Sequence, residues 1–139
     1  MSRQVTDTPT NIVDTWGIRP GLRVWVGGHG LAAKQEIEKH LEGTERPPTG
    51  PLDAALIAPL TTDEALYFAG KLRPRLERGA VVWIVHPTPR TEGGQAFTAR
   101  LDELVVGMFE RGLAEIGRAP LTDQLSTIGF RADHAPDEF

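Results

Sequence analysis

Short apolar runs of strand length alternate along the chain with longer segments that have helical periodicity. The apolar runs are Leu22–Val26, Leu52–Pro59 and Gly79–His86, and the last is rich in β-branched and aromatic residues. Apolar residues recur at helical spacing after each run, in segments 31–43, 61–76 and 97–112. This alternation favours an α/β fold with an open sheet, in which right-handed crossovers place helices on both faces.

Two shorter strand-like runs, Gly112–Gly117 and Ser126–Arg131, end the pattern without a helix between them. They are close enough in sequence to pair antiparallel, so we expect an open, mostly parallel Rossmann-like sheet that closes with an antiparallel strand pair. The exposed edge of that pair offers a route to a homodimer. We expect a flexible arm over residues 1–11, a single α/β domain over 12–131 that begins with a short helical turn, and an acidic tail over 132–139.

The segment that joins the first predicted helix to the second predicted strand cannot form a buried strand. Residues 44–51 read TERPPTGP and contain three prolines and no apolar side chain. A Rossmann-like sheet would normally place a strand at this point. We therefore predict a shortened sheet.

Charge and composition exclude several function classes. The chain of 139 residues has a formal net charge of -4, which argues against nucleic acid and against an anionic membrane as partners. It contains no cysteine, so disulfides and thiolate chemistry are excluded. The first residues lack the apolar core of a secretory signal, and no apolar run reaches membrane-spanning length. We expect a cytoplasmic protein.

A glycine-rich turn follows the first predicted strand. The pattern from Gly28 through Gly30 to Ala33 matches G-x-G-x-x-A at a strand-to-helix junction, where backbone N–H groups could face an anionic cofactor. The alternative is that the glycines only allow a tight turn. A cofactor would also need an acid on the next strand. Asp53 opens its strand, which places it at the opposite edge of the sheet, and Glu42 and Glu45 are the remaining substitutes.

Other candidate site residues lie where strands end. His29 and His86 both follow strands, and either could act as a general base in a shared site. Arg90, in the loop Thr88–Gln95, could bind a carboxylate or phosphate, and Asp63 could meet a polar substrate. Solvent exposure or helix capping, by Asp63 and Glu64 for example, explains each of them without a ligand. Two histidines without a supporting carboxylate make a poor metal site, so no metal is expected.

The later part of the chain resembles a class I S-adenosylmethionine-dependent methyltransferase. Two segments resemble that family: the strand that opens with Leu52 and Asp53, and the turn and strand LRPRLERGAVVWIVHP. The glycine-rich turn also lies at the position of the family's first motif. The segment Trp16–Val24 and the proline that ends the third apolar run are similar to a family of small bacterial proteins of unknown function with a trimmed methyltransferase-like fold. The resemblance covers Ile12 to Arg131.

Two departures from these families bear on function. The small bacterial proteins commonly carry a lysine pair where this chain has Thr88 and Pro89. Active methyltransferases have a second strand ending in an acid that binds the cofactor ribose, and none is evident here. Our preferred hypothesis is therefore a non-catalytic domain without a cofactor that binds a protein or a small ligand. The alternatives are an S-adenosylmethionine-dependent methyltransferase, with Gly28, His29 and Gly30 near the cofactor and His86 near the methyl acceptor, and a nucleotide-binding module.

Overall fold

The strands form one sheet in the order β1-β2-β3-β5-β4 in the computed structural model, which describes residues 12–133. Strands β1, β2 and β3 run parallel, and β5 runs antiparallel to both β3 and β4. The open sheet and its antiparallel C-terminal pair confirm the predicted fold class. The strands are β1 (Val24–Gly27), β2 (Leu52–Ile57), β3 (Leu76–Pro87), β4 (Leu113–Pro120) and β5 (Leu125–Ala132).

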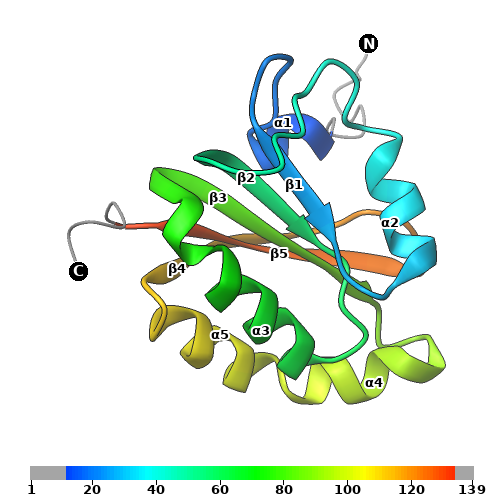
Figure 1. Cartoon of the computed structure of the whole chain (residues 1–139). Coiled ribbons are helices and arrows are strands. Elements are labelled where there is room, and N and C mark those ends of the chain that lie inside the picture. The colour runs from blue at the N-terminus through cyan, green and yellow to red at the C-terminus, as the bar shows by residue number, and fades with distance from the viewer. Residues whose placement is uncertain (1–11, 134–139) are drawn as a thin grey trace, which may run out of the picture.

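Helices cover both faces of the sheet (Figure 1). Helices α1 (Ile12–Trp16) and α2 (Leu31–Glu38) lie on one face, and α3 (Thr62–Leu72), α4 (Glu92–Ala99) and α5 (Leu101–Phe109) lie on the other. A short 3₁₀ turn, Arg73–Arg75, follows α3 where Pro74 is expected to end regular helix. Within residues 12–133, no helix is long and apolar enough to cross a membrane.

Strand β2 is buried on both sides, as its continuous apolar run predicts. Its side chains alternate between two hydrophobic clusters. Ala54 and Leu56 pack with α1 and α2, whereas Ala55 and Ile57 pack with α3, α4 and α5. This alternation explains why nearly every position of the strand is apolar.

Strand β1 forms one edge of the sheet, because residues 44–51 do not form the missing strand. The only pairing on its outer side is a single bridge between Arg23 and Glu45 among the described residues. The Val24 N–H donates to the Glu45 carbonyl and the Glu45 N–H donates to the Leu22 carbonyl, each at 2.8 Å. The prediction that the proline-containing segment supplies no strand is confirmed.

The helix boundaries differ from the expectation in two places. The first long helix ends at Glu38 rather than at Gly43, although Leu41 beyond it remains buried. The third splits into α4 and α5 at Arg100, whose φ of -110° and ψ of 14° leave the helical region. The helical spacing of apolar residues continues across Arg100, because Phe97 and Leu104 are both buried against the same face of the sheet.

The loop expected over Thr88–Gln95 is shorter than predicted, because α4 begins inside it. The hydroxyl of Thr91 accepts a hydrogen bond from the Gly94 N–H at 3.1 Å and caps the helix. This cap outweighs the low helix propensity of the two following glycines. Strand β5 also extends to Ala132, the first residue of the predicted tail, while residues 1–11 and 134–139 lie outside the described part.

Candidate functional site

The turn between β1 and α2, residues Gly27–Gly30, packs directly on the backbone at the end of β2. The Ala58 N–H donates to the Gly27 carbonyl and the Gly30 N–H donates to the Ala58 carbonyl, both at 2.8 Å. Gly28 has a φ of +115°, and a Cβ there would lie 2.3 Å from the Ala58 carbonyl oxygen. Close contact with β2 therefore accounts for the glycine at this position. We call Gly27–Gly30 the glycine turn.

A carboxylate of the chain itself binds the glycine turn. The His29 backbone N–H donates to Glu64 Oε2 at 2.8 Å, and the ring Nδ1 of His29 lies 2.5 Å from the same oxygen. The other oxygen, Oε1, accepts from the Leu60 N–H at 2.7 Å. Because the Glu64 side chain is only 13% exposed, it forms a semi-buried link between the loops after β1 and β2.

Helix capping brings Glu64 to this place. Thr61 is the N-cap of α3, and its hydroxyl accepts from the Glu64 N–H at 3.1 Å. In the common capping box, the glutamate side chain returns to the N-cap N–H. Here the Glu64 carboxylate accepts from the N–H of Leu60, the residue before the N-cap, and also from the N–H of His29. The expected capping function of Glu64 is present, and the contact with the glycine turn is the part that sequence reasoning missed.

The environment of Glu64 keeps its side chain ionised at neutral pH. Burial raises the pKa of Glu64, but hydrogen bonds from the Leu60 N–H, the His29 ring and the His29 N–H together outweigh burial, so the net pKa lies below the usual value. A fixed negative charge therefore lies at the mouth of the glycine turn. A phosphate group there would meet like charge and would compete for the His29 N–H.

His86 is buried and held by its neighbours. It is 4% exposed, its ring stacks on Phe97 with centroids 4.7 Å apart, and Nδ1 lies 3.0 Å from the Pro87 carbonyl. Since a carbonyl oxygen only accepts, this contact places the ring proton on Nδ1. Burial lowers the pKa of His86, and Arg118 lowers it further against the raising effect of the Pro87 carbonyl. The imidazole is therefore neutral at pH 7.

The remaining predicted site residues are dispersed. Strand β2 lies between β1, which precedes the turn with His29, and β3, which carries His86. The two rings contact different partners, Glu64 and Phe97. Arg90 is exposed between β3 and α4. Asp63 is exposed in the first turn of α3, where its charge acts on Arg100. The structure brings together only the glycine turn and Glu64.

The acids considered as ribose ligands do not reach the glycine turn. Asp53 lies at the amino end of β2, where its carboxylate takes hydrogen bonds from Arg23 Nε at 3.0 Å and Nη2 at 2.9 Å. Hydrogen bonds from Arg23 lower the pKa of Asp53. Glu45 bridges Arg23 at the same edge, and Glu42 lies just beyond α2 beside Pro20 and His40. The predicted placement of Asp53, opposite Gly28, is confirmed.

The outer side of α3 and α5 carries an exposed apolar surface. Tyr67, Val106 and Phe109 are 59%, 58% and 68% exposed. A groove of about 540 Å³ lies between the two helices. Val106 lines it together with Leu66 and Gly107 among others, whereas Tyr67 and Phe109 are not among its lining residues. A Cβ at Gly107 would lie 2.6 Å from Leu66 Cδ2, so the glycine lets the two helices approach closely. We call Tyr67, Val106 and Phe109 with this groove the α3–α5 face.

Across residues 12–133, no group of three His, Cys, Asp or Glu side chains is placed to hold an ion.

Comparison with known proteins adds evidence on the fold. A scan against protein-family models gave no match, and a search of curated proteins gave none either. Among solved structures, a SAM-dependent methyltransferase from Aquifex aeolicus superposes with a TM-score of 0.61 at 11% identity, over 90% of this chain and 89% of that chain. The chain has a methyltransferase-like fold.

Fibrillarins share this methyltransferase-like fold. The Methanococcus jannaschii fibrillarin pre-rRNA processing protein has a TM-score of 0.53 at 8% identity and covers 82% of this chain, which spans only 57% of it. Aeropyrum pernix fibrillarin, described in complex with natively bound S-adenosyl-L-methionine, has a TM-score of 0.54 at 9% identity, over 81% of this chain and 67% of its own. At these identities the likeness concerns the fold alone.

Proposed function

We propose that the chain is a methyltransferase-like domain that neither binds S-adenosylmethionine nor transfers methyl groups, and that acts by holding a protein partner. The observation that carries this proposal is the Glu64 carboxylate on the His29 N–H. The fold likeness favours the competing function, an S-adenosylmethionine-dependent methyltransferase, so the decision depends on whether the site residues fit the cofactor.

The residues at the glycine turn fit S-adenosylmethionine poorly. The His29 N–H and the Gly30 N–H already donate to Glu64 and to the Ala58 carbonyl. On the outer side of β1, the bridge to Glu45 lies at the amino end of the strand, away from the turn. Within residues 12–133, an adenosine would find no strand beside the carboxyl end of β1, and none of Glu42, Glu45 and Asp53 reaches the turn to bind its ribose hydroxyls. A transferase without these contacts would lose most of its cofactor affinity.

A nucleotide-binding module is disfavoured by the same geometry. Binding of phosphate at a strand-to-helix turn relies on free backbone N–H groups in a field of positive potential. Here the ionised Glu64 occupies the His29 N–H and supplies negative charge instead.

The α3–α5 face is the surface that favours a protein partner. Monomeric proteins rarely expose several large apolar side chains together, and such patches mark interaction sites. The groove is lined by three acids, Asp102, Glu103 and Glu110, whereas the guanidinium of Arg111 turns inward to the Gly107 carbonyl at 2.7 Å. We infer a partner segment with apolar side chains flanked by Lys or Arg.

Dimerisation through the sheet edge, the other partner considered, is less well supported. Edge strand β4 has an irregular register between Glu115 and Gly117, an ion pair between Glu115 and Arg118, and Pro120 at its end. Bulges, charges and prolines are the usual means by which edge strands avoid pairing with another chain.

Calorimetric titration with S-adenosylmethionine and S-adenosylhomocysteine tests the proposal. We expect no heat of binding for either compound up to about 1 mM. Micromolar binding would overturn the non-catalytic function. Gly28→Val is unsuitable as a control, because its side chain would collide with the Ala58 carbonyl and disturb the fold. Glu64→Gln is the better variant for altering the turn, because it keeps the shape of the Glu64 side chain and removes only its charge.

A further inference from the structure

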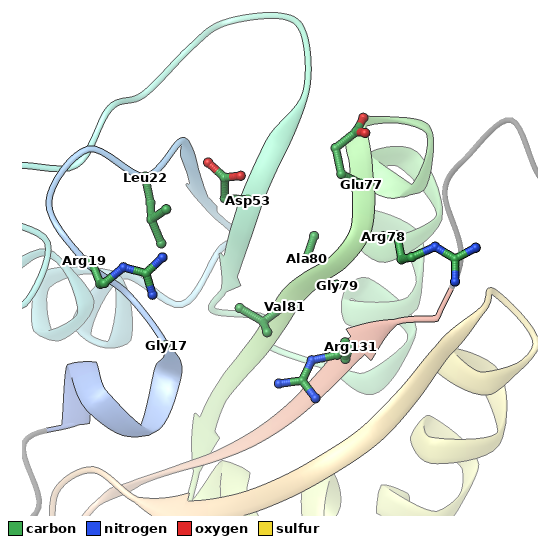
Figure 2. A pocket seen from close by; sticks show the side chains of 10 residues that line it. All are labelled: Gly17, Arg19, Leu22, Asp53, Glu77, Arg78, Gly79, Ala80, Val81 and Arg131. Atoms are coloured by element: carbon green, nitrogen blue, oxygen red, sulfur yellow. The ribbon is translucent and has the colours of Figure 1, made fainter.

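A second cavity lies at the opposite end of the parallel strands from the glycine turn. It measures about 330 Å³ and is bounded by the α1–β1 connection, the start of β2, the first half of β3 and the end of β5 (Figure 2). Of the residues considered for a cofactor at the glycine turn, Asp53 alone lines this cavity, at the amino end of β2. Because the cavity carries three arginine side chains, we call it the arginine cavity.

The charge around the arginine cavity is positive although the chain is acidic overall. Arg19, Arg78 and Arg131 line it together with Asp53 and Glu77. The charge of Asp53 is balanced by Arg23, whose Nε and Nη2 each donate a hydrogen bond to the carboxylate. The guanidinium groups of Arg19 and Arg131 therefore add positive charge beside a carboxylate, Asp53, that already has a partner in Arg23. This local excess contrasts with the net charge of -4 of the whole chain.

Arg19 and Arg131 approach the cavity from different elements. Figure 2 shows both guanidinium groups turned toward the space in front of Val81, Arg19 from the α1–β1 connection and Arg131 from β5. Neither guanidinium donates a hydrogen bond or joins an ion pair within residues 12–133. A guanidinium offers several N–H donors in a planar fork, which suits carboxylate and phosphate oxygens. Both therefore have free donors for a ligand.

The backbone fixes the positions of these two arginines. Arg131 forms the end pair of the β3–β5 ladder with Val81 and also pairs with Ala114 of β4, so its Cα is held between two strands. Arg19 lies in a turn that is closed by a hydrogen bond from the Leu22 N–H to the Arg19 carbonyl at 3.2 Å. The Gly21 N–H in the same turn donates to the Gly43 carbonyl at 2.8 Å. The spacing between the two side chains is therefore set by the fold.

The cavity also has apolar walls. Leu22 and Val81 line it, and Gly79 and Ala80 leave its floor without long side chains. A small molecule with a charged group and an apolar part would contact both kinds of surface, whereas a bare inorganic ion would contact only the arginines.

We propose that the arginine cavity is an anion-binding site, in which Arg19 and Arg131 hold a carboxylate or phosphate group from two sides while Leu22 and Val81 contact the apolar remainder of the ligand. This site is independent of the proposed function, since it lies away from both the glycine turn and the α3–α5 face. The anion can come from a free small molecule or from the chain's own acidic side chains Asp137 and Glu138.

Titration of the full, isotope-labelled chain with phenyl phosphate, followed by NMR at the amides of Gly79, Ala80 and Val81, tests the site. We expect saturable shifts, weaker binding of inorganic phosphate, and no shifts with phenol, which has the apolar part alone. Arg19→Gln and Arg131→Gln should each weaken phenyl phosphate binding about tenfold or more. Arg100→Gln, an equal change of charge at an exposed arginine elsewhere, should leave it unchanged.

The double variant Asp137→Asn, Glu138→Gln separates the two sources of the anion. Equal phenyl phosphate affinity in this variant and in the wild type supports a free ligand. Binding that becomes detectable only in the variant supports occupation of the cavity by the chain's own carboxylates. Absence of saturable shifts in both proteins, or equal weakening by Arg100→Gln and Arg131→Gln, would overturn the anion site.

Discussion

The Glu64 carboxylate and the His29 backbone N–H are joined at 2.8 Å across 35 residues of sequence. This contact links the first turn of α3 to the turn that a Rossmann-like fold uses for cofactors. It gives the carboxylate a structural function at the turn where Rossmann-like folds bind their ligands. The contact therefore connects the stability of the fold with the absence of a cofactor function that we propose.

Replacing Glu64 by glutamine should destabilise the fold by about 1–3 kcal/mol, because the N–H groups of His29 and Leu60 lose a charged acceptor. Urea denaturation measures this effect. Asp63→Asn is the matched control, since Asp63 is exposed beside Glu64 and should contribute about 0.5 kcal/mol through the helix dipole and its exposed interaction with Arg100. Equal losses in the two variants would contradict a special function of Glu64.

The contribution of Glu64 should depend on pH. Its pKa is lower in the folded chain than in the unfolded chain, so the stabilisation is present above the unfolded pKa, about 4.3, and is lost as the pH falls through the folded pKa. The difference in unfolding free energy between wild type and Glu64→Gln should therefore shrink as the pH falls from about 6 to about 3, a window that contains the unfolded pKa of about 4.3. A difference that stays constant over this window would contradict the ionised state assigned here.

Gly28→Ala should cost more stability than Gly17→Ala. Both glycines have positive φ, +115° and +74°, but only at Gly28 would the new Cβ meet a backbone atom, the Ala58 oxygen at 2.3 Å. We expect about 1 kcal/mol for Gly17→Ala from backbone conformation and clearly more for Gly28→Ala. Similar unfolding free energies for the two variants would show that β2 does not contact the turn as described.

His86 should titrate below its ordinary pKa of 6.5 in an NMR experiment, because burial disfavours the charged ring. The unfolded chain then binds this proton more readily than the folded chain, so stability should fall as the pH drops below about 6.5. His86→Gln should flatten that part of the stability profile. Titration of His86 at or above 6.5 would contradict its burial against Phe97.

Phe109→Ser should abolish binding of a protein partner without unfolding the domain, because Phe109 is 68% exposed. Leu31→Ser, at an exposed leucine outside the α3–α5 face, is the matched control. Co-purification followed by chemical cross-linking should show a protein retained by wild type and Leu31→Ser, lost by Phe109→Ser and cross-linked to Lys71 on α3. Equal retention by both variants would contradict the proposed interaction face.

The order of elements could be predicted from local pattern alone. The short apolar runs located β1, β2 and β3, and the prolines in residues 44–51 predicted that no strand would form there. These features depend on neighbours a few residues apart, and hydrophobic periodicity reports them directly. The break at Arg100 could not be predicted, because the apolar positions on both sides of it remain in helical phase.

The candidate site could be predicted only in part. The glycine turn was recognised, but two tertiary contacts decide what it can do: Gly28 against Ala58 and His29 against Glu64. The acids at the start of the helix indicated capping, but this local pattern could not reveal that Glu64 also accepts a hydrogen bond from His29, 35 residues away. His86 was expected at a strand end, yet the strand continues through Pro87 and the ring is buried.

An NMR titration of the labelled chain with S-adenosylhomocysteine, following the amides of His29 and Gly30, tests the central claim most directly. These N–H groups donate to Glu64 and Ala58, so we predict no shift of either signal up to about 1 mM ligand. A saturable shift of both signals at micromolar concentration would contradict the claim and would support an S-adenosylmethionine-dependent methyltransferase instead.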